Sequence, residues 1–218
     1  MKKMLKEAAI LFCITLISGC LLGLVYDVTK EPIAEAKAKA EQEACQEVFA
    51  DATSFAEVGW TTGTVPASIT AAESDYGTTI DKVMAAQDAS GNVLGYVITV
   101  TNHEGYGGDI QFSVGIRNDG TVNGVSILDI AETAGLGMKA DPVLKDQFVN
   151  KNVAQFVTTK TGATGDDQID AISGATITSD AFVRGANAAL NHFQAIQADP
   201  TIAVILPDNP EEGGNGNE

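Results

Sequence analysis

An uncharged apolar segment near the N-terminus constrains this chain more than any other feature of its sequence. Residues 8–26 read AAILFCITLISGCLLGLVY, without a single charged side chain. About 20 apolar residues in a helix cross the hydrocarbon core of a bilayer. Lys2, Lys3 and Lys6 precede the segment, and positively charged flanks tend to stay in the cytoplasm. We therefore predict a cytoplasmic N-terminus over residues 1–7, a single transmembrane helix over residues 8–26, and the remainder on the extracytoplasmic side of the cytoplasmic membrane.

Two other interpretations of this segment remain open. A cleaved signal peptide has a similar basic start, but its apolar region is shorter and a small-residue cleavage site follows it. Ile17-Ser18-Gly19-Cys20 also looks like a lipobox, in which Cys20 would be the lipidated residue. Residues 21–26 stay apolar, which favours an uncleaved helix over a lipoprotein. All three interpretations export the remainder of the chain.

Charge and cysteine usage restrict what the rest of the chain can bind. The net charge is −16, with 13 Lys and Arg against 29 Asp and Glu. Nucleic acid is an unsuitable partner, because its binding depends on basic side chains that neutralise phosphates. Beyond Cys45 the sequence has no cysteine, and the whole chain has 2 histidines. A disulfide framework, a thiolate metal site and a histidine-rich metal site are therefore excluded for the globular part.

The residues after the apolar segment predict a helical connection, a domain and a tail. Residues 27–50 are rich in Ala, Glu and Lys and predict a helix that connects the membrane to a domain. We expect the domain over residues 51–198. The last residues, from 199 to 218, end in PDNPEEGGNGNE, a composition typical of an acidic disordered tail.

Within the domain, strand signals come first and helix signals follow. Residues 51–80 show no clear period, and we expect loops with short elements there. Two hairpins follow, separated by turns rich in Asn, Asp and Gly. The expected strands are residues 83–87, 93–101, 110–116 and 122–128, and the expected helices are residues 141–149 and about 178–197. The fold class is therefore α+β, an antiparallel sheet meander with helices packed on it.

The segment Asp170-Ala171-Ile172-Ser173-Gly174-Ala175-Thr176-Ile177-Thr178-Ser179 carries the strongest chemical signal. Small residues at Gly174 and Ala175 let a bulky anion approach the backbone. Free N–H groups and the helix dipole favour a phosphate at the start of the predicted last helix. Hydroxyl groups at Ser173, Thr176, Thr178 and Ser179 add donors. From these properties alone, an ordinary helix cap is the favoured interpretation.

DAISGATITS resembles the flavinylation motif Asp-x-x-Ser/Thr-Gly-Ala-Thr of the FMN-binding domain. That domain occurs in the G subunit of the Rnf complex and in the C subunit of the sodium-translocating NADH:quinone reductase. The resemblance implies FMN attached covalently to Thr176 through a phosphoester. It also implies a flavin transferase that installs FMN from FAD and reads Asp170. The other cofactor-binding residues expected from the motif are Ser173, Gly174, Ala175 and Thr178.

A second Gly-Ala-Thr sequence ends at Thr164, but it lacks the acidic residue of the motif. The position that corresponds to the motif aspartate, three residues before Thr161, is Thr158. Asp and Gly residues follow Thr164, where the motif would need a helix to begin. We therefore assign the attachment to Thr176.

Two further segments resemble the same family. Residues 132–137 are similar to its Glu-Thr-Pro-Gly-Leu-Gly segment, with Ala134 in place of proline. Residues 105–110 are similar to its Gly-Tyr-x-Gly-x-Ile segment. If the first segment lines the flavin, its cofactor-binding residues are Glu132, Thr133, Gly135, Leu136 and Gly137. The alternatives are that Glu132 is solvated, that the glycines permit a turn, and that Tyr106 is a core or strand-edge aromatic.

The resemblance implies a membrane-anchored electron carrier of an Rnf-type ferredoxin:NAD oxidoreductase coupled to ion transport. Its partners would be the other membrane subunits and the flavin transferase. We expect no substrate chemistry of its own, no catalytic residue and no metal. One alternative is a carrier like the C subunit of a sodium-translocating quinone reductase, or another exported flavoprotein. An alternative of a different class is a lipid-anchored binding domain without a cofactor.

Overall fold

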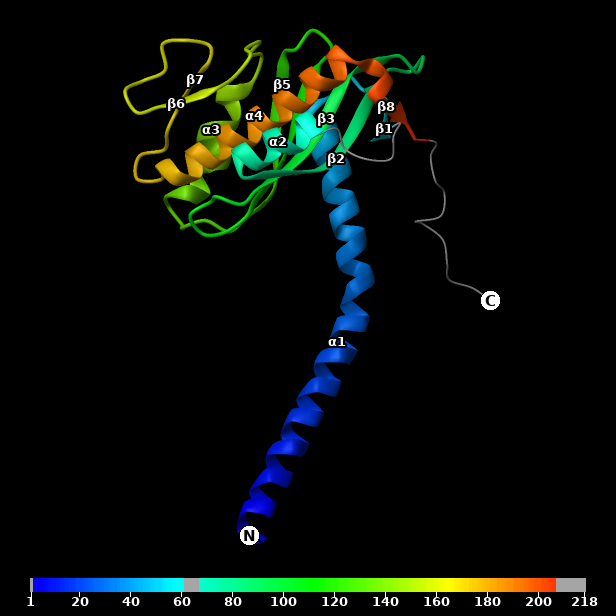
Figure 1. The fold of residues 1–218 in the computed structure, drawn as a ribbon, viewed down its shortest axis with the longest axis vertical. Coiled ribbons are helices and arrows are strands. Elements are labelled where there is room, and N and C mark those ends of the chain that lie inside the picture. Colours follow the sequence, from blue (N-terminus) through cyan, green and yellow to red (C-terminus); the bar gives the residue numbers. More distant parts are fainter. Residues whose placement is uncertain (1, 61–66, 207–218) are drawn as a thin grey trace. The chain divides into compact units, whose positions relative to one another are not determined.

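Five strands that follow one another in the chain form an antiparallel meander, and a sixth strand pairs with its edge. The computed structural model describes residues 2–60 and 67–206. The strands lie in the order β5-β4-β3-β2-β1-β8 (Figure 1). They are β1 (Ser54–Trp60), β2 (Thr78–Gln87), β3 (Val93–Asn102), β4 (Ile110–Arg117), β5 (Val122–Ile130) and β8 (Ala203–Ile205). The predicted α+β class with an antiparallel sheet is confirmed.

Both predicted hairpins are present, and side chains in their turns explain why they form there. In the β2–β3 turn, Oδ1 of Asp88 accepts hydrogen bonds from the N–H groups of Ser90 and Asn92, at 2.8 and 2.9 Å. In the β4–β5 turn, Oδ1 of Asp119 accepts from the N–H of Thr121 at 2.9 Å. Such side-chain bonds to the local backbone favour turns over continued strands.

The sheet is larger than the sequence predicted. Residues 51–80, expected as loops with short elements, contain β1, the helix α2 (Ala67–Tyr76) and the start of β2. The strand β1 has no apolar alternation of its own and is held by its pairing with β2 and β8. Residues 200–205 correct the predicted tail, since they form the 3-10 helix η2 (Pro200–Ile202) and β8. The rest of that tail, from 207, lies outside the described residues.

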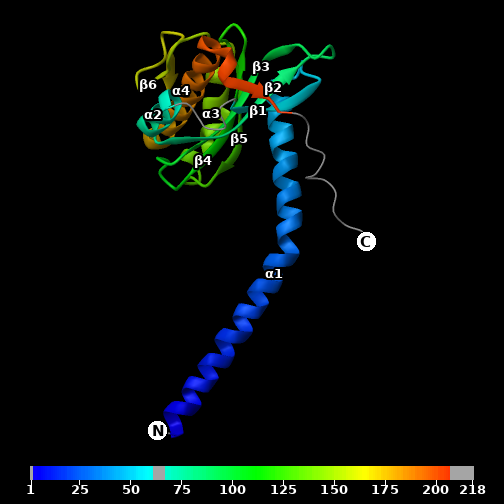
Figure 2. The ribbon, with the colours of Figure 1, turned by 45° about the vertical axis from the view of Figure 1, so that its right-hand side comes forward.

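The two faces of the sheet carry different cores. The helix α4 (Thr176–Ala198) crosses one face, with α2 beside it (Figures 1 and 2). There the rings of Phe112 on β4 and Phe182 on α4 stack, with centroids 4.7 Å apart. Neighbouring side chains on a strand point to opposite faces. Val97 on β3 points to the face opposite α4 and belongs to the second core there, together with Val48 and Phe49.

Four short elements lie between β5 and α4 in the described chain. The 3-10 helix η1 (Gly137–Lys139) leads directly into the helix α3 (Ala140–Phe148), which lies within one residue of its predicted bounds. The strands β6 (Val157–Thr159) and β7 (Gln168–Asp170) then form a separate parallel pair. The helix α4 begins at Thr176, two residues earlier than predicted.

The N-terminal helix α1 (Lys2–Val48) contains the apolar segment and the connecting helix in one element. The chain divides into two units, residues 1–42 and 43–218. In the first unit the large apolar side chains are exposed, for example Phe12 at 64% and Leu22 at 72%. A helix that is apolar on all sides and long enough to cross a bilayer suits a membrane anchor.

His192 on α4 is buried beside Trp60, with ring centroids 5.0 Å apart. Neither ring nitrogen has a hydrogen-bond partner among the described residues. Burial disfavours the charged ring and lowers the pKa of His192 from 6.5 to about 4. Between these two values the unfolded chain binds a proton that the folded chain does not. The folded state is therefore stabilised above pH 6.5 and loses this contribution as the pH falls towards 4.

We expect His192→Leu to weaken this pH dependence. The histidine accounts for up to about 1.4 kcal/mol per pH unit within the window. The measurement is the free energy of unfolding from urea titrations in detergent at pH 7 and pH 4.5. His103→Gln serves as the control for an exposed histidine. An unchanged pH dependence in His192→Leu would contradict the assignment.

Candidate functional site

Three segments that are distant in the sequence surround one pocket. Its volume is about 440 Å³, within the range typical of sites for small molecules. One wall is the start of α4 and the loop before it, the second follows β5, and the third is the loop between β3 and β4. The lining residues are Tyr106, Glu132, Thr133, Leu136, Gly137, Gly174, Ala175, Thr176, Ile177 and Thr178.

The loop before α4 is locked in a tight turn. The N–H of Ala175 donates to the carbonyl of Ile172 at 2.9 Å, and Gly174 has a φ of 79° that side chains rarely adopt. The buried hydroxyl of Ser179 accepts from the N–H of Ile172 at 2.9 Å and donates to the carbonyl of Ala175 at 3.0 Å. One hydroxyl from the first turn of α4 thus fixes both ends of the turn.

The first turn of α4 lines the pocket with Thr176, Ile177 and Thr178. Ala175 is the N-cap, and among the described residues no side chain caps it. The first helical N–H groups have no partner within the helix, and the helix dipole is positive at this end. No acidic residue lies in the first turn. Thr176, half-buried at the first helical position, presents its hydroxyl in an environment that favours an anion.

The second wall lies very close to α4. A Cβ atom added to Gly137 would lie 2.6 Å from Cβ of Glu132 and 2.8 Å from Oγ1 of Thr178. A Cβ atom on Gly174 would lie 3.2 Å from Cδ2 of Leu136. Glycine at these two positions therefore permits the close approach of the two walls.

Glu132 is a buried acid with one unpartnered oxygen. It is 9% exposed, and its Oε1 accepts a hydrogen bond from the N–H of Gly107 at 3.3 Å. Its Oε2 has no hydrogen-bond partner among the described residues. A buried oxygen without a donor is rare in folded proteins and calls for an explanation.

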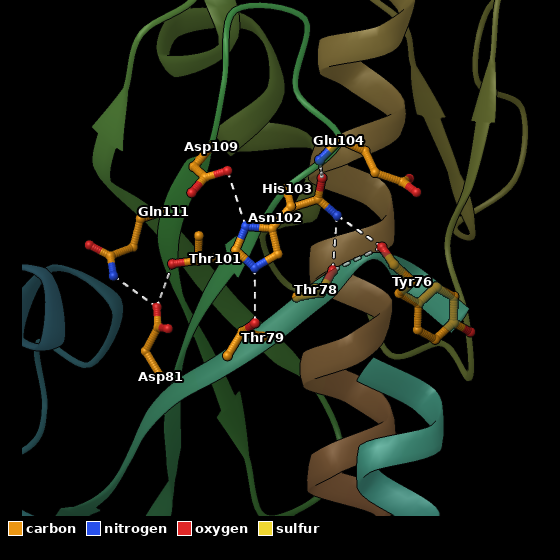
Figure 3. A network of polar contacts seen from close by, with 10 residues as sticks. All are labelled: Tyr76, Thr78, Thr79, Asp81, Thr101, Asn102, His103, Glu104, Asp109 and Gln111. Carbon is orange, nitrogen blue, oxygen red and sulfur yellow. Dashed lines mark hydrogen bonds and ion pairs between the residues drawn. The ribbon is translucent and has the colours of Figure 1, made fainter. Parts of the chain in front are cut away.

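The third wall is the loop 103–109, which contributes Tyr106. Figure 3 shows how its start is fastened. The ring of His103 contacts Oδ1 of Asp109 through Nδ1 at 3.0 Å and Oγ1 of Thr79 through Nε2 at 2.9 Å. The buried Asn102 donates to the carbonyl of Tyr76 and accepts from the N–H of Glu104. The loop is therefore tied to β2 at the point where it leaves β3.

The structure brings together eight of the eleven residues predicted to bind a cofactor. Asp170 ends β7 outside the pocket, with its backbone N–H donating to Oε1 of Gln147 at 2.7 Å. Ser173 is exposed in the turn and, like Gly135, does not line the pocket. The residues in the pocket are Thr176, Gly174, Ala175, Thr178, Glu132, Thr133, Leu136 and Gly137.

Three residues have roles that the sequence did not predict: Tyr106 and Ser179 were expected in other roles, and Ile177 in none. Tyr106, 70% exposed, is neither core nor strand-edge but lies in the pocket wall, and Ile177 lies beside Thr176. Ser179 acts through the turn that it holds. An exposed apolar residue directly after the motif threonine was the available signal for Ile177. Nothing in the sequence indicated the partners of Ser179.

Comparison with known proteins decides the family. Residues 105–191 match the model of the FMN-binding domain, and residues 1–48 match that of the RnfG N-terminal region. The G subunit of the Na(+)-translocating ferredoxin:NAD(+) oxidoreductase complex of Acetobacterium woodii is 33% identical over 199 residues, which cover 88% of this chain and 93% of that protein. The chain belongs to the RnfG family. The predicted resemblance is confirmed.

A second relative also aligns over most of both chains. The G subunit of the ion-translocating oxidoreductase complex of Methanosarcina acetivorans is 33% identical over 196 residues, which cover 89% of this chain and 96% of that protein. Among solved structures, the crystal structure of Shewanella oneidensis NqrC superimposes with a TM-score of 0.49 at 20% identity. That alignment covers 70% of this chain and 86% of NqrC.

We expect Ser179→Ala to destabilise the turn before α4. The change leaves the buried N–H of Ile172 without an acceptor, which costs about 1–3 kcal/mol. Urea titration of the full chain in detergent measures the loss. Ser173→Ala is the matched control, because its side chain is exposed in the same turn, and we expect a change below about 0.5 kcal/mol. Equal losses in the two variants would rule out the bracing role of Ser179.

Proposed function

We propose that this chain is the membrane-anchored electron carrier of an Rnf-type ion-translocating oxidoreductase, with FMN attached covalently to Thr176. The observation that carries the proposal is the position of Thr176. It lines the pocket at the first residue of a helix whose leading N–H groups have no partner within the helix. A phosphoester at the Thr176 oxygen would place its remaining phosphate oxygens against those groups.

The other walls of the pocket suit the rest of the cofactor. Glu132 Oε2 offers an acceptor, and FMN has hydroxyl and N–H donors in its ribityl chain and ring. Tyr106, Leu136 and Ile177 offer exposed apolar surface. When bound, FMN supplies the redox chemistry, while the chain fixes its position and surrounds it with defined contacts.

Attachment would be a phosphoryl transfer from FAD catalysed by a flavin transferase. The Thr176 oxygen forms a bond to the FMN phosphorus, the pyrophosphate bond breaks, AMP leaves, and the hydroxyl proton passes to AMP or solvent. Asp170 is partly exposed and outside the pocket, so a transferase could contact it without displacing the walls. Its place in the motif supports this recognition role.

Several observations favour an RnfG-type carrier over the alternatives. The match of residues 1–48 to the RnfG N-terminal region supports an Rnf partner set over that of a quinone reductase. The residues after Cys20 continue α1 without interruption, which favours an uncleaved anchor over a lipidated Cys20. The lysines before the anchor support an extracytoplasmic domain. A cofactor-free binding domain would give no reason for the unpartnered oxygen of Glu132, a residue that lines the pocket.

The test of the attachment is the intact mass of the full chain co-expressed with a flavin transferase. We expect wild type to gain the mass of one FMN less water, and Thr176→Val to gain none because valine has no oxygen to esterify. Thr176→Ser keeps the hydroxyl and is expected to retain the adduct. Thr164→Val is the control at the second Gly-Ala-Thr sequence. An adduct on Thr176→Val, or none on wild type, would overturn the proposal.

The orientation has a separate test. Alkaline phosphatase fused after residue 206 folds only outside the cytoplasm, and green fluorescent protein exported by the general route stays dark. We expect an active phosphatase fusion and a dark fluorescent fusion in intact cells. The opposite pair of results would place the domain in the cytoplasm.

A further inference from the structure

The loop between β3 and β4 combines a flexible composition with a fixed position. Residues 103–109 contain Gly105, Gly107 and Gly108, and three glycines in seven residues make a loop costly to order. Asn102 and Ile110 are paired neighbours on β3 and β4, so the loop leaves and re-enters the sheet at one place. Contacts outside its own backbone must therefore decide where its tip lies.

His103 joins the start of this loop to its end and to the sheet. A carboxylate only accepts hydrogen bonds, so Nδ1 of His103 donates to Oδ1 of Asp109. In the neutral ring Nε2 then accepts from the hydroxyl of Thr79 on β2. Figure 3 shows the imidazole between these two side chains. The three residues thus form a continuous fastening across the base of the loop.

Tyr106 lies at the tip of the fastened loop. Outside α1, Tyr106 at 70% and Ile177 at 52% are the most exposed large apolar side chains among the described residues, and both line the pocket. Leu136, 40% exposed, lies with them. A flat aromatic ring bound among these side chains would cover apolar surface that water now contacts.

We infer that the Thr79–His103–Asp109 fastening positions Tyr106 against the isoalloxazine ring of the bound flavin. This inference rests on the proposed function and adds positioning residues to it. The fastening lies on the loop base and on β2, and none of its three residues lines the pocket. Its effect on the flavin would pass through Tyr106, because Tyr106 is the residue of loop 103–109 that lines the pocket.

A tyrosine in contact with a flavin shortens the lifetime of flavin fluorescence, because it donates an electron to the excited ring. The experiment measures this lifetime on the full, flavin-loaded chain in detergent. We expect a short lifetime in wild type and a longer one in Tyr106→Phe, which keeps the ring but is a poor electron donor. An unchanged lifetime in Tyr106→Phe would overturn the inference.

Thr79 offers a matched pair that tests the fastening itself. We expect Thr79→Val, which keeps the shape of the side chain without its hydroxyl, to lengthen the lifetime, and Thr79→Ser to preserve it. Asp109→Ala is expected to act like Thr79→Val. Asp81→Ala is the control, because Asp81 bonds Thr101 and Gln111 on the same strands without touching the loop. A wild-type lifetime in both Thr79→Val and Asp109→Ala would overturn the fastening role.

Two further readouts separate the possible failures. Intact mass of every sample reports whether flavin is attached, so a wild type without an adduct counts against the proposed function and not against the fastening. Thermal unfolding of the same samples reports stability. A purely structural role would lower the unfolding temperature of Thr79→Val and leave the lifetime unchanged, and that result would also overturn the inference.

Discussion

The packing of α4 against the sheet is the interaction on which the site depends. The stacked rings of Phe112 and Phe182 and the apolar face of the helix fix its axis across the strands. A helix held along its length has a defined first turn, and that turn carries Thr176. The anion-attracting end of the helix is therefore placed by apolar contacts along the helix. The apolar contacts that stabilise the core therefore also set the geometry of the site.

Sheet topology explains why three distant segments can surround that turn. Ile110 at the start of β4 is paired both with Asn102 at the end of β3 and with Ile130 at the end of β5. The loop 103–109 and the segment after β5 therefore emerge side by side at one end of the sheet. The N–H of Gly107 then reaches Glu132 directly. Antiparallel pairing thus brings the second and third walls of the pocket together.

Much of the site could be predicted from the sequence because it is encoded in contiguous motifs. The segment from Asp170 to Thr178 and the segment from Glu132 to Gly137 each carry small residues in a recognisable order. Tyr106 was found in a motif, but its exposure depends on how the loop is fastened. His103 has its partner Thr79 on β2, 24 residues away. No local pattern specifies such contacts.

The same distinction applies to the fold. Hairpins with Asp88 and Asp119 in their turns were predictable, because those side chains act within four residues of themselves. The strand β1 and residues 203–205 were not, because β1 is held by its pairing with β2 and β8, and β8 by its pairing with β1. Propensity is a weak guide where pairing supplies the stability. Residues 202–206 read IAVIL, an apolar run that the acidic and Gly-rich end of the chain outweighed when a tail was predicted.

If flavin is attached to Thr176 as proposed, the hydroxyl of Ser179 would affect the rate of electron transfer. Because it bonds both ends of the turn before Thr176, the turn and the helix move as one body. A redox group attached to such a body changes its surroundings little when its charge changes. The energy needed to reorganise the site would then be small, and electrons could pass at a given distance with a lower barrier. With the turn held in this way, the proposed attachment point would favour fast electron transfer.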